Sequence, residues 1–452
     1  MEQFFHLKEN RTTVRTEVIA GITTFMTMAY ILAVNPNLLG KTGMDGGSVF
    51  TATALASAIA SFAMALLANL PFALSAGMGL NAYFTYTVCM GMGYSWEVAL
   101  AAVCVEGLIF IVLSLTNVRE AIFNAIPGEL KLAVSVGIGL FITFIGLQNA
   151  HIVVDGATLV TLFSFKDSVT SGTFSSEGIT VLLALIGMLI TALLVIKNVK
   201  GNILLGILIT WGLGILCQLF GLYVPNPDAR FYSLIPSSLI AMPASVTPTL
   251  FKMDFSDLLS LNFVVVVFSF LFVDIFDTLG TLIGCASKAD MLDKDGKLPR
   301  IKGALLADAI GTTVGAVLGT STITTFVESS SGIAEGGRTG LTSIVVGFLF
   351  LLSLFFSPIF LAIPSFATAP ALIIVGFFMM QQVSKIDWSN MLTAIPSFIC
   401  IFAMPFAYSI SEGIAFGIIS YTVLHLAAGK GKNVTVLMYV LSFIFILKYI
   451  FL

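Results

Sequence analysis

The stretch STITTFVESSSGIAEGGRTG, which runs from Ser321 to Gly340, decides how this chain is expected to fold. It stands among long apolar segments, but it does not read as one continuous membrane helix. The β-branched residues that dominate Thr322–Val327 favour an extended strand. Glu328 and three serines follow, and serines cap helix N-termini well. The stretch therefore predicts a short strand that leads into a half-helix.

The stretch LPFALSAGMGLNAYF, from Leu70 to Phe84, has the same character in the first half of the chain. Its apolar run is broken by one proline, one serine and two glycines: Pro71, Ser75, Gly77 and Gly79. We expect two short antiparallel strands, one from each half, that cross at the membrane midplane and each feed a half-helix. The alternative is a pair of loops tucked against one surface.

An internal repeat precedes both stretches. LASAIASFAMALLAN (Leu55–Asn69) and LADAIGTTVGAVLGT (Leu306–Thr320) are identical at six of fifteen positions, at an offset of 251. The hydrophobic runs described below give seven membrane spans in each half. Because seven is an odd number, equivalent halves must have opposite orientations in the membrane. Such an inverted repeat is the architecture of many secondary transporters, whose substrate sites lie where paired helices are interrupted.

The composition places the chain in a membrane. Of 452 residues, 58% are hydrophobic and only 10% are charged, whereas a soluble domain carries about 25% charged residues. These values exclude a soluble enzyme and a disordered chain. The formal net charge of -3 offers no basic surface for nucleic acid. The five cysteines lie in or at the ends of apolar runs, so we interpret them as small core residues rather than as disulfides.

Hydrophobic runs of about 20 residues, the length that crosses a bilayer, occur at fourteen positions. They lie near 17–37, 49–69, 71–92, 95–115, 126–146, 178–197, 202–223, 261–284, 302–319, 320–338, 340–361, 366–383, 389–408 and 411–428. A further run at 435–451 either crosses the membrane or lies at its interface. The polar, basic start is not followed by a short apolar stretch with a cleavage site, so we expect no removable signal peptide.

Loop charges orient these spans, because Lys and Arg concentrate on the cytoplasmic side. With the N-terminus inside, sixteen basic residues fall inside: Lys8, Arg11, Arg15, Arg119, Lys131, Lys197, Lys200, Lys288, Lys294, Lys297, Arg300, Lys302, Arg338, Lys385, Lys430 and Lys432. Four fall outside: Lys41, Lys166, Arg230 and Lys252. We therefore expect a multi-pass protein of the cell membrane with a cytoplasmic N-terminus.

The spans divide the chain into five parts. These are a cytoplasmic tail (1–16), a first seven-span repeat (17–223), an extracellular linker (224–258), a second seven-span repeat (259–428) and a C-terminal hydrophobic segment (429–452).

Acidic residues inside spans are rare and are functional by default. Asp274 and Asp277 are three residues apart, so a helix places them on one face. Burial disfavours the charged form of a carboxylate, which would let either residue hold and release a proton; alternatively, one of them caps or pairs with a neighbouring helix. Glu328 lies at a predicted helix N-terminus, where the dipole stabilises an anion. We interpret it as an ionised hydrogen-bond acceptor.

A purely structural role can explain several other charged residues. Hydrogen bonds between helices adequately explain Asp308 and Glu106, although Asp308 is also a candidate for proton coupling. Glu335 and Arg338 either form an ion pair at the inner end of the helix or take part in the site. The histidines and cysteines form no metal-binding set, and no Walker-type phosphate loop is present. We expect no metal, no other cofactor and no ATP-driven transport by this chain alone.

Four motifs closely resemble the AzgA-like purine permeases of the nucleobase and ascorbate transporter superfamily. They are GITTFMTMAYILAVNP (Gly21–Pro36), SAGMGLNAYF (Ser75–Phe84), VDIFDTLGTLIG (Val273–Gly284) and TTFVESSSGIAEGGRTGLTSIVVGFLFLLSLFFSPI (Thr324–Ile359). The resemblance covers nearly the whole chain. It implies an all-α polytopic membrane fold of fourteen spans in two inverted seven-span repeats. It also implies uptake of hypoxanthine, guanine or adenine coupled to protons.

The resemblance further implies a division of each repeat and a set of functional residues. Four spans of each repeat form a core domain (17–115 and 261–361), and three form a gate domain (126–223 and 366–428). The essential acidic residue of the eighth span falls on Asp274 or Asp277, and the one after the tenth-span strand falls on Glu328. The signature near the end of that span falls on Glu335, Gly336, Gly337, Arg338 and Thr339.

Purine chemistry agrees with these residues. Carboxylates accept hydrogen bonds from purine N–H groups, and strand backbone groups supply the complementary edge. Possible stacking faces are Phe72, Tyr83, Phe84 and Phe326. The candidate binding residues are Glu328, Asp274, Asp277, Thr325, Phe326, Ser75 and Gly77, and the candidate proton-coupling residues are Asp274, Asp277 and Asp308. An ionised Glu328 favours hypoxanthine and guanine, which have a donor at N1, whereas a protonated carboxyl could favour adenine.

The main prediction is therefore secondary active uptake of a purine nucleobase with a proton, in the lipid bilayer, with a homodimer left open. An anion carrier of similar fold would need a neutral or positive midplane, which the candidate carboxylates oppose. A channel would need a continuous polar pore. A membrane-embedded enzyme would need a nucleophile or a metal cluster, and the histidine and cysteine positions provide neither.

Overall fold

The computed structural model describes residues 2–116, 126–156, 159–226, 231–288, 291 and 298–451. Within these residues, eleven helices are long and apolar enough to cross a membrane. They are α2 (Val14–Met28) with α3 (Ile31–Leu39), α4 (Gly46–Leu67), α6 (Trp96–Leu115), α8 (Gly128–Asn149), α10 (Ile179–Ile196), α11 (Asn202–Leu219), α12 (Leu261–Lys288), α13 (Ile301–Leu318), α15 (Gly340–Ser353) with α16 (Ser357–Leu361), α17 (Ser365–Met380) and α19 (Ile410–Ala427).

The remaining elements are shorter. The helices are α1 (Glu2–Phe5), α5 (Met78–Ala82), α9 (Phe165–Thr170), α14 (Ser329–Ala334), α18 (Met391–Phe406) and α20 (Val436–Phe451). The strands are β1 (Leu74–Ala76), β2 (Val153–Gly156), β3 (Leu159–Leu162) and β4 (Ile323–Thr325). A π-helical segment, Tyr83–Gly91, continues α5.

The eleven long helices lie at eleven of the fourteen positions expected from the sequence. Two of the other three, near 71–92 and 320–338, hold a strand followed by a half-helix. The third, near 389–408, holds α18, which has 16 residues and contains Pro396 and Pro405. At 1.5 Å per residue such a helix is about 24 Å long, shorter than a bilayer core of about 30 Å.

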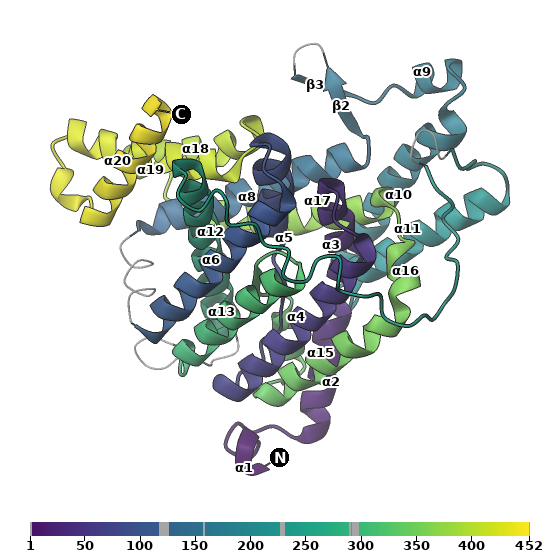
Figure 1. Ribbon diagram of the computed structural model, residues 1–452, viewed down its shortest axis with the longest axis horizontal. Helices are drawn as coiled ribbons and strands as arrows, with labels where there is room; N and C mark the ends of the chain where they lie inside the picture. Colours follow the sequence, from purple (N-terminus) through teal and green to yellow (C-terminus); the bar gives the residue numbers. More distant parts are fainter. Residues whose placement is uncertain are drawn as a thin grey trace.

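The helices pack in two groups, and each group combines helices from both halves of the sequence (Figure 1). In one group, α13 packs against α6 and α4, and α15 packs against α4 and α2. In the other, α8 packs against α17 and α18, and α10 packs against α11 and α17. Gly139 permits the contact between α8 and α17, because a Cβ there would lie 2.6 Å from the Gly376 carbonyl oxygen. Small residues allow membrane helices to approach this closely.

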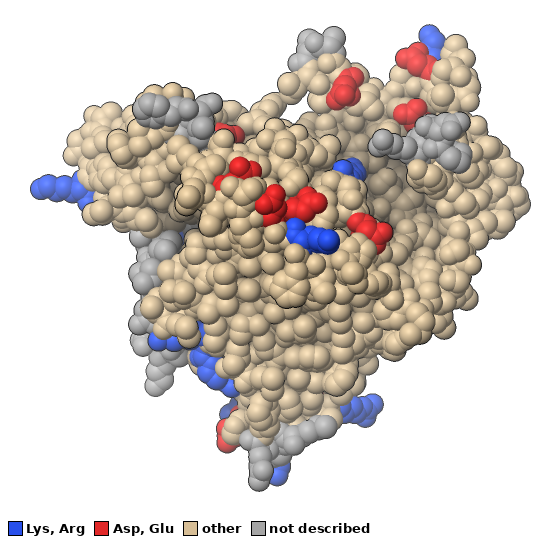
Figure 2. Space-filling model, in the orientation of Figure 1, with Lys and Arg blue, Asp and Glu red and all other residues tan. Residues whose placement is uncertain are grey.

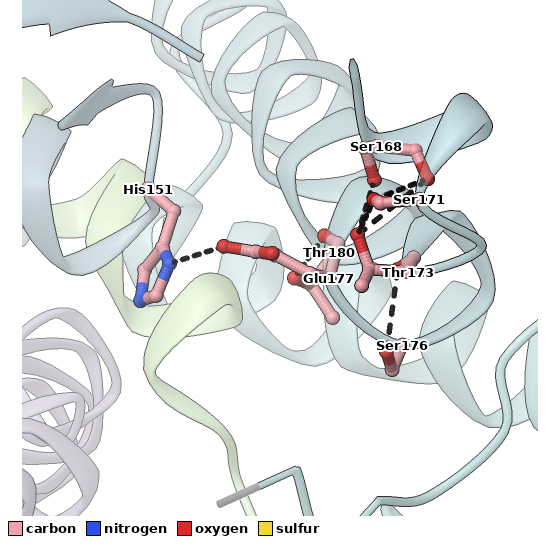
Figure 3. Close-up of polar contacts among 7 residues, drawn as sticks. All are labelled: His151, Ser168, Ser171, Thr173, Ser176, Glu177 and Thr180. Atoms are coloured by element: carbon pink, nitrogen blue, oxygen red, sulfur yellow. Dashed lines mark hydrogen bonds and ion pairs between the residues drawn. The ribbon is translucent and has the colours of Figure 1, made fainter. Parts of the chain in front are cut away.

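The segment between α8 and α10 is structured rather than a plain polar loop. Strands β2 and β3 form an antiparallel hairpin, and α9 follows. Figure 3 shows His151 pointing toward Glu177, with Nδ1 3.3 Å from Oε1. In the same view the hydroxyl of Thr173 contacts those of Ser168 and Ser171. The His151–Glu177 contact ties the end of α8 to the segment just before α10, and the Thr173 contacts close the end of α9.

Charged residues separate toward the two ends of the molecule. On the face shown in Figure 2, basic residues lie both at the lower end near the N-terminus and in the upper part, where most of the acidic residues lie. A broad band between them has almost no charge, as a membrane protein requires. Arg119, Arg230, Lys294 and Lys297, four of the basic residues used to predict the orientation, lie outside the described residues.

The C-terminal hydrophobic run forms a helix of its own. Helix α20 packs along α19, and the Ser442 hydroxyl donates to that of Thr422 over 2.7 Å. The Tyr449 hydroxyl also donates to Glu412 at the start of α19. The final apolar segment is therefore held against the second half of the chain.

Candidate functional site

Strands β1 and β4 meet in the interior of the first helix group. They pair antiparallel, with Leu74 opposite Thr325, Ser75 opposite Thr324 and Ala76 opposite Ile323. Every residue of both strands is buried. Each strand leads into a half-helix, α5 or α14. The prediction of two short antiparallel strands, one from each half, is confirmed, and surface loops do not form here.

Hydroxyl groups of neighbouring helices hold the two strands. The Ser57 hydroxyl of α4 lies 2.7 Å from that of Ser75 in β1. The Thr278 hydroxyl of α12 lies 2.8 Å from that of Thr324 in β4. The register partners Ser75 and Thr324 are thus each anchored to a different helix.

Further bonds fix the entry to β4. The Thr322 hydroxyl donates to Glu106 Oε2 over 2.8 Å, and the Thr312 hydroxyl donates to the carbonyl oxygen of Ile323 over 2.9 Å. Glu106 is fully buried. Its hydrogen bond is to the segment that precedes the strand, so it positions β4 rather than only joining two helices.

Asp274 and Asp308 lie beside β4 and are fully buried. The Thr278 hydroxyl contacts Oδ1 of Asp274 at 3.0 Å and Oδ1 of Asp308 at 2.8 Å. The structure therefore brings two of the predicted proton-coupling residues together around one hydroxyl group. Because that hydroxyl also contacts Thr324, the pair is connected to the strand.

Asp277 occupies a different position from Asp274, although both belong to α12. Its side chain is partly exposed, and its Oδ2 would lie 3.6 Å from a Cβ placed on Gly77. Gly77 caps the N-terminus of α5. Asp277 is therefore directed at the junction of β1 with its half-helix.

Glu328 lies at the corresponding junction of the second half. It occupies the N-cap position of α14, without a side-chain capping hydrogen bond, and is partly exposed. The Tyr30 hydroxyl donates to its Oε1 over 2.8 Å. Glu328 is within electrostatic range of Asp277. A carboxylate thus lies at the N-terminal end of each half-helix, where the helix dipole favours a negative charge.

Two other predicted binding residues lie next to Glu328 in the chain. The Thr325 hydroxyl is buried and has no hydrogen-bond partner among the described residues. The Phe326 ring lies 6.4 Å from the Tyr30 ring. Among the other candidate stacking rings, Tyr83 and Phe84 pack against Phe270 of α12. Tyr30 therefore links the Phe326 ring to the Glu328 carboxylate.

The signature Glu335–Thr339 lies at the far end of α14, away from the strand pair. Glu335 forms an ion pair with Lys200, and the Arg338 guanidinium donates to the carbonyl oxygens of Ile333 and Gly337, each over 2.7 Å. These interactions therefore do not include the predicted ion pair between Glu335 and Arg338. Gly336 has a φ of 98°, a left-handed conformation that favours glycine.

The signature also encloses a buried acid that the sequence analysis missed. Glu17 of α2 is fully buried and accepts from the backbone N–H groups of Arg338 (2.9 Å) and Thr339 (3.3 Å). The Thr342 hydroxyl donates to it over 2.6 Å. A carboxylate at the N-terminus of α15 satisfies N–H groups that have no partner within the helix.

A cavity of about 520 Å³ lies beside the signature. Gly336 and Arg338 line it together with residues of the N-terminal tail and of the segment before α13, including Arg11 and Arg300. The signature is therefore placed at the end of the molecule where the N-terminus lies, and the candidate binding residues are elsewhere.

Tyr30 and Thr278 were also missed as site residues. Both lie in motifs that the sequence analysis quoted, and Thr278 follows Asp274 by four residues, which is one helical turn. Neither residue is charged, so neither stood out as a group whose burial in a membrane span costs free energy. Within the described residues, no group of three or more His, Cys, Asp or Glu side chains is arranged to hold a metal ion.

Comparisons with known proteins agree with this architecture. The family model described as "Permease family", that of the xanthine/uracil permeases, matches residues 15–416. The chain is 45% identical to the guanine/hypoxanthine permease PbuG of Bacillus subtilis over 464 residues, covering 100% of both chains. It is 40% identical to the adenine permease AdeP of Escherichia coli over 452 residues, covering 100% of this chain and 96% of AdeP.

The fold also resembles that of a solved transporter. The transmembrane domain of the cyanobacterial bicarbonate transporter BicA superposes with a TM-score of 0.60 at 15% identity, covering 91% of this chain and 97% of that domain. At this identity the likeness concerns the fold alone. The sequence matches decide the family: this chain is a multi-pass membrane protein that belongs to the xanthine/uracil permease family.

Proposed function

We propose that this protein imports purine nucleobases, with hypoxanthine and guanine preferred, by proton symport with alternating access. The observation that carries the proposal is the pair of carboxylates, Asp277 and Glu328, at the N-terminal junctions of the two half-helices. The names of two full-length relatives, a guanine/hypoxanthine permease and an adenine permease, support purines as the substrate class.

Two acceptors on opposite sides of a strand pair suit an oxopurine. Hypoxanthine has an N–H donor on its six-membered ring and another on its five-membered ring, and carboxylates accept both. Glu328 would bind one donor and Asp277 the other. The unpartnered hydroxyl of Thr325 would meet a purine acceptor, and Phe326 would stack on the ring.

The Tyr30 bond supports the preference for oxopurines. A hydroxyl that donates to Oε1 leaves Glu328 as an acceptor. Adenine has an acceptor at N1 and would face that carboxylate without a proton between them. We therefore expect adenine to compete less well than hypoxanthine or guanine.

Uptake of labelled hypoxanthine into cells that lack purine transporters tests the proposal. We expect saturable accumulation that guanine inhibits most strongly, adenine less and uracil least, and that a protonophore abolishes. Accumulation that survives the protonophore would refute symport, and inhibition by uracil alone would refute the purine assignment. If adenine is the best inhibitor, the preferred substrate is adenine and Glu328 binds in its protonated form.

A further inference from the structure

The hydroxyl group of Thr278 contacts three oxygen atoms at once. These are Oδ1 of Asp274 at 3.0 Å, Oδ1 of Asp308 at 2.8 Å and Oγ1 of Thr324 at 2.8 Å. All four side chains are buried, with at most 1% of any residue exposed. The cluster joins α12, α13 and β4, so any change in it reaches the strand.

Counting protons shows what these contacts require. A hydroxyl has one proton to donate and two lone pairs that accept. Thr278 can accept from Thr324 and donate to one aspartate, but its contact with the other aspartate then brings two lone pairs together. If Thr278 instead donates to Thr324, both aspartate contacts lack a proton. All three contacts become hydrogen bonds only when at least one of the two carboxyl groups is protonated.

Electrostatics leads to the same protonation state. Two carboxyl oxygens that contact one hydroxyl lie within roughly 4–6 Å, the distance at which like charges oppose joint ionisation. Three more acids lie on the elements around the cluster: Asp277 on α12, which is within electrostatic range of Asp308, Glu328 at the start of α14, which is within electrostatic range of Asp277, and Glu106 on α6, which bonds Thr322 just before β4. A negative charge on Asp277 would also favour a retained proton on Asp308.

We propose that Asp274 and Asp308 share a proton through Thr278, and that Thr278 transmits the presence of this proton to strand β4. The inference deepens the proposed symport and rests on it, because it names the group that links the proton to the substrate. Thr278 is a positioning residue, since its hydroxyl contacts the acids and the strand.

The shared proton can move without any other reactant. Thr278 accepts the proton of one carboxyl group and gives its own hydroxyl proton to the other. One O–H bond forms on Thr278 as another breaks, so the hydroxyl is regenerated and the proton has passed from α12 to α13 or back.

Loss of the proton weakens the hold on β4. Two ionised carboxylates then compete for a single hydroxyl proton, and one contact becomes repulsive. Thr278 then moves away from the acid to which it cannot donate, and its contact with Thr324 shifts with it. Thr325 and Glu328 follow Thr324 in the chain, so the proposed binding residues move with the strand, and purine affinity depends on the proton.

Three variants in proteoliposomes test the relay. Thr278→Val removes the hydroxyl and keeps the shape, and Thr278→Ser keeps the hydroxyl. Thr210→Val is the matched control, because Thr210 is equally buried and its hydroxyl donates to the Gly206 carbonyl oxygen of its own helix over 2.7 Å. Thr210 is also distant in sequence from the two aspartates. Each variant is measured for hypoxanthine Kd, for accumulation driven by a pH gradient, and for proton uptake reported by a pH-sensitive dye.

We expect Thr278→Val to lower the proton-driven accumulation ratio at least about tenfold, as the loss of a hydrogen bond to a charged group predicts, with a much smaller change in Kd. Thr278→Ser and Thr210→Val should remain close to the wild type. If Thr278→Ser fails as Thr278→Val does, packing rather than the hydroxyl matters, and the relay is refuted. Full coupling in Thr278→Val refutes it as well.

A second variant covers the case in which Thr278→Val does not fold. Thr324→Val leaves the two aspartates and Thr278 intact but removes the link to β4. We expect its hypoxanthine Kd to depend less on pH than that of the wild type, and a dependence as strong as that of the wild type overturns the proposal. If the wild type itself takes up no protons with hypoxanthine, the proposed symport fails. If the wild type is coupled and the variants are coupled equally well, the relay alone fails.

Discussion

The two strand and half-helix units, Leu74–Ala82 and Ile323–Ala334, have the same shape but different chemistry. In the first unit, β1 is anchored by the neutral pair Ser57–Ser75, and the half-helix begins at Gly77. In the second unit, β4 is anchored through Thr278 to two aspartates, and the half-helix begins at Glu328. Even the carboxylate next to Gly77, that of Asp277, comes from the second half.

The internal repeat shows at which aligned positions the two units differ. At the offset of 251, Ser57 aligns with Asp308 and Ser61 aligns with Thr312. Ser61 accepts from the backbone of β1, and Thr312 donates to the backbone of β4. Equivalent positions thus hold the two strands, but at one of them a hydroxyl has been replaced by a carboxyl. The repeat supplies the scaffold, and its divergence supplies the groups that can bind a proton.

The largest effect is expected from filling the space at Gly77. A Cβ there would lie 2.5 Å from Cγ2 of Thr324, so Gly77→Ala forces the two strands apart. We expect hypoxanthine uptake to fall to background while the protein still reaches the membrane. The double variant Gly77→Ala with Thr324→Ser removes the clashing methyl group and keeps the hydroxyl, so it should recover uptake. A double variant as inactive as the single one would show that the strand contact is not the cause.

A smaller effect is expected from Glu328→Gln, which removes the charged acceptor at the start of α14. Loss of a charged hydrogen bond predicts a 10- to 100-fold weaker Kd for hypoxanthine, to order of magnitude (about 1.5–3 kcal/mol). Isothermal titration of the purified protein measures it. Glu177→Gln, the same change at a residue that bonds His151 in the segment shown in Figure 3, is the control and should bind normally. Equal affinity in Glu328→Gln and wild type would remove Glu328 from the site.

The smallest effect is expected from Thr325→Val. The Thr325 hydroxyl has no partner among the described residues, so its removal should leave the free protein as stable as the wild type or more stable. A neutral hydrogen bond contributes about 0.5–1.5 kcal/mol, so hypoxanthine Kd should weaken about 2- to 10-fold. Thermal unfolding with and without hypoxanthine separates the two effects. A variant that loses stability without ligand would instead point to a structural role for the hydroxyl.

Much of the strand crossing could be predicted because its signals are local. The β-branched run Thr322–Val327 favours a strand, and Glu328 with its serines marks the start of a helix. The predicted spans differ from the observed helices where local sequence signals conflict. The run 389–408 is mostly apolar, yet α18 begins only after the Asn390 cap and ends one residue after Pro405, at 16 residues. The π-helical turns of Tyr83–Gly91 have no comparable sequence signal.

The site residues also divide into those with a local sequence signal and those without one. Glu328, Asp277 and Asp308 could be found because charge in an apolar span is conspicuous. Thr278 and Tyr30 could not, since a hydroxyl on an apolar helix is common. Apart from Asp274, one turn before Thr278, their side-chain partners at the site lie 30 to almost 300 positions away in the chain. Glu17 precedes the apolar part of its span, and only folding brings the backbone of Arg338 to it. Side-chain partners distant in sequence require the fold.

Replacing Asp308 by the residue at the aligned position of the first half tests the central claim most directly. Wild type and Asp308→Ser are compared in proteoliposomes for hypoxanthine accumulation under an imposed pH gradient and for hypoxanthine exchange without one. The account predicts that the wild type concentrates hypoxanthine, whereas Asp308→Ser still exchanges it but does not accumulate it. Accumulation by Asp308→Ser equal to that of the wild type would contradict the claim that the carboxyl groups of the second half couple the proton to the purine.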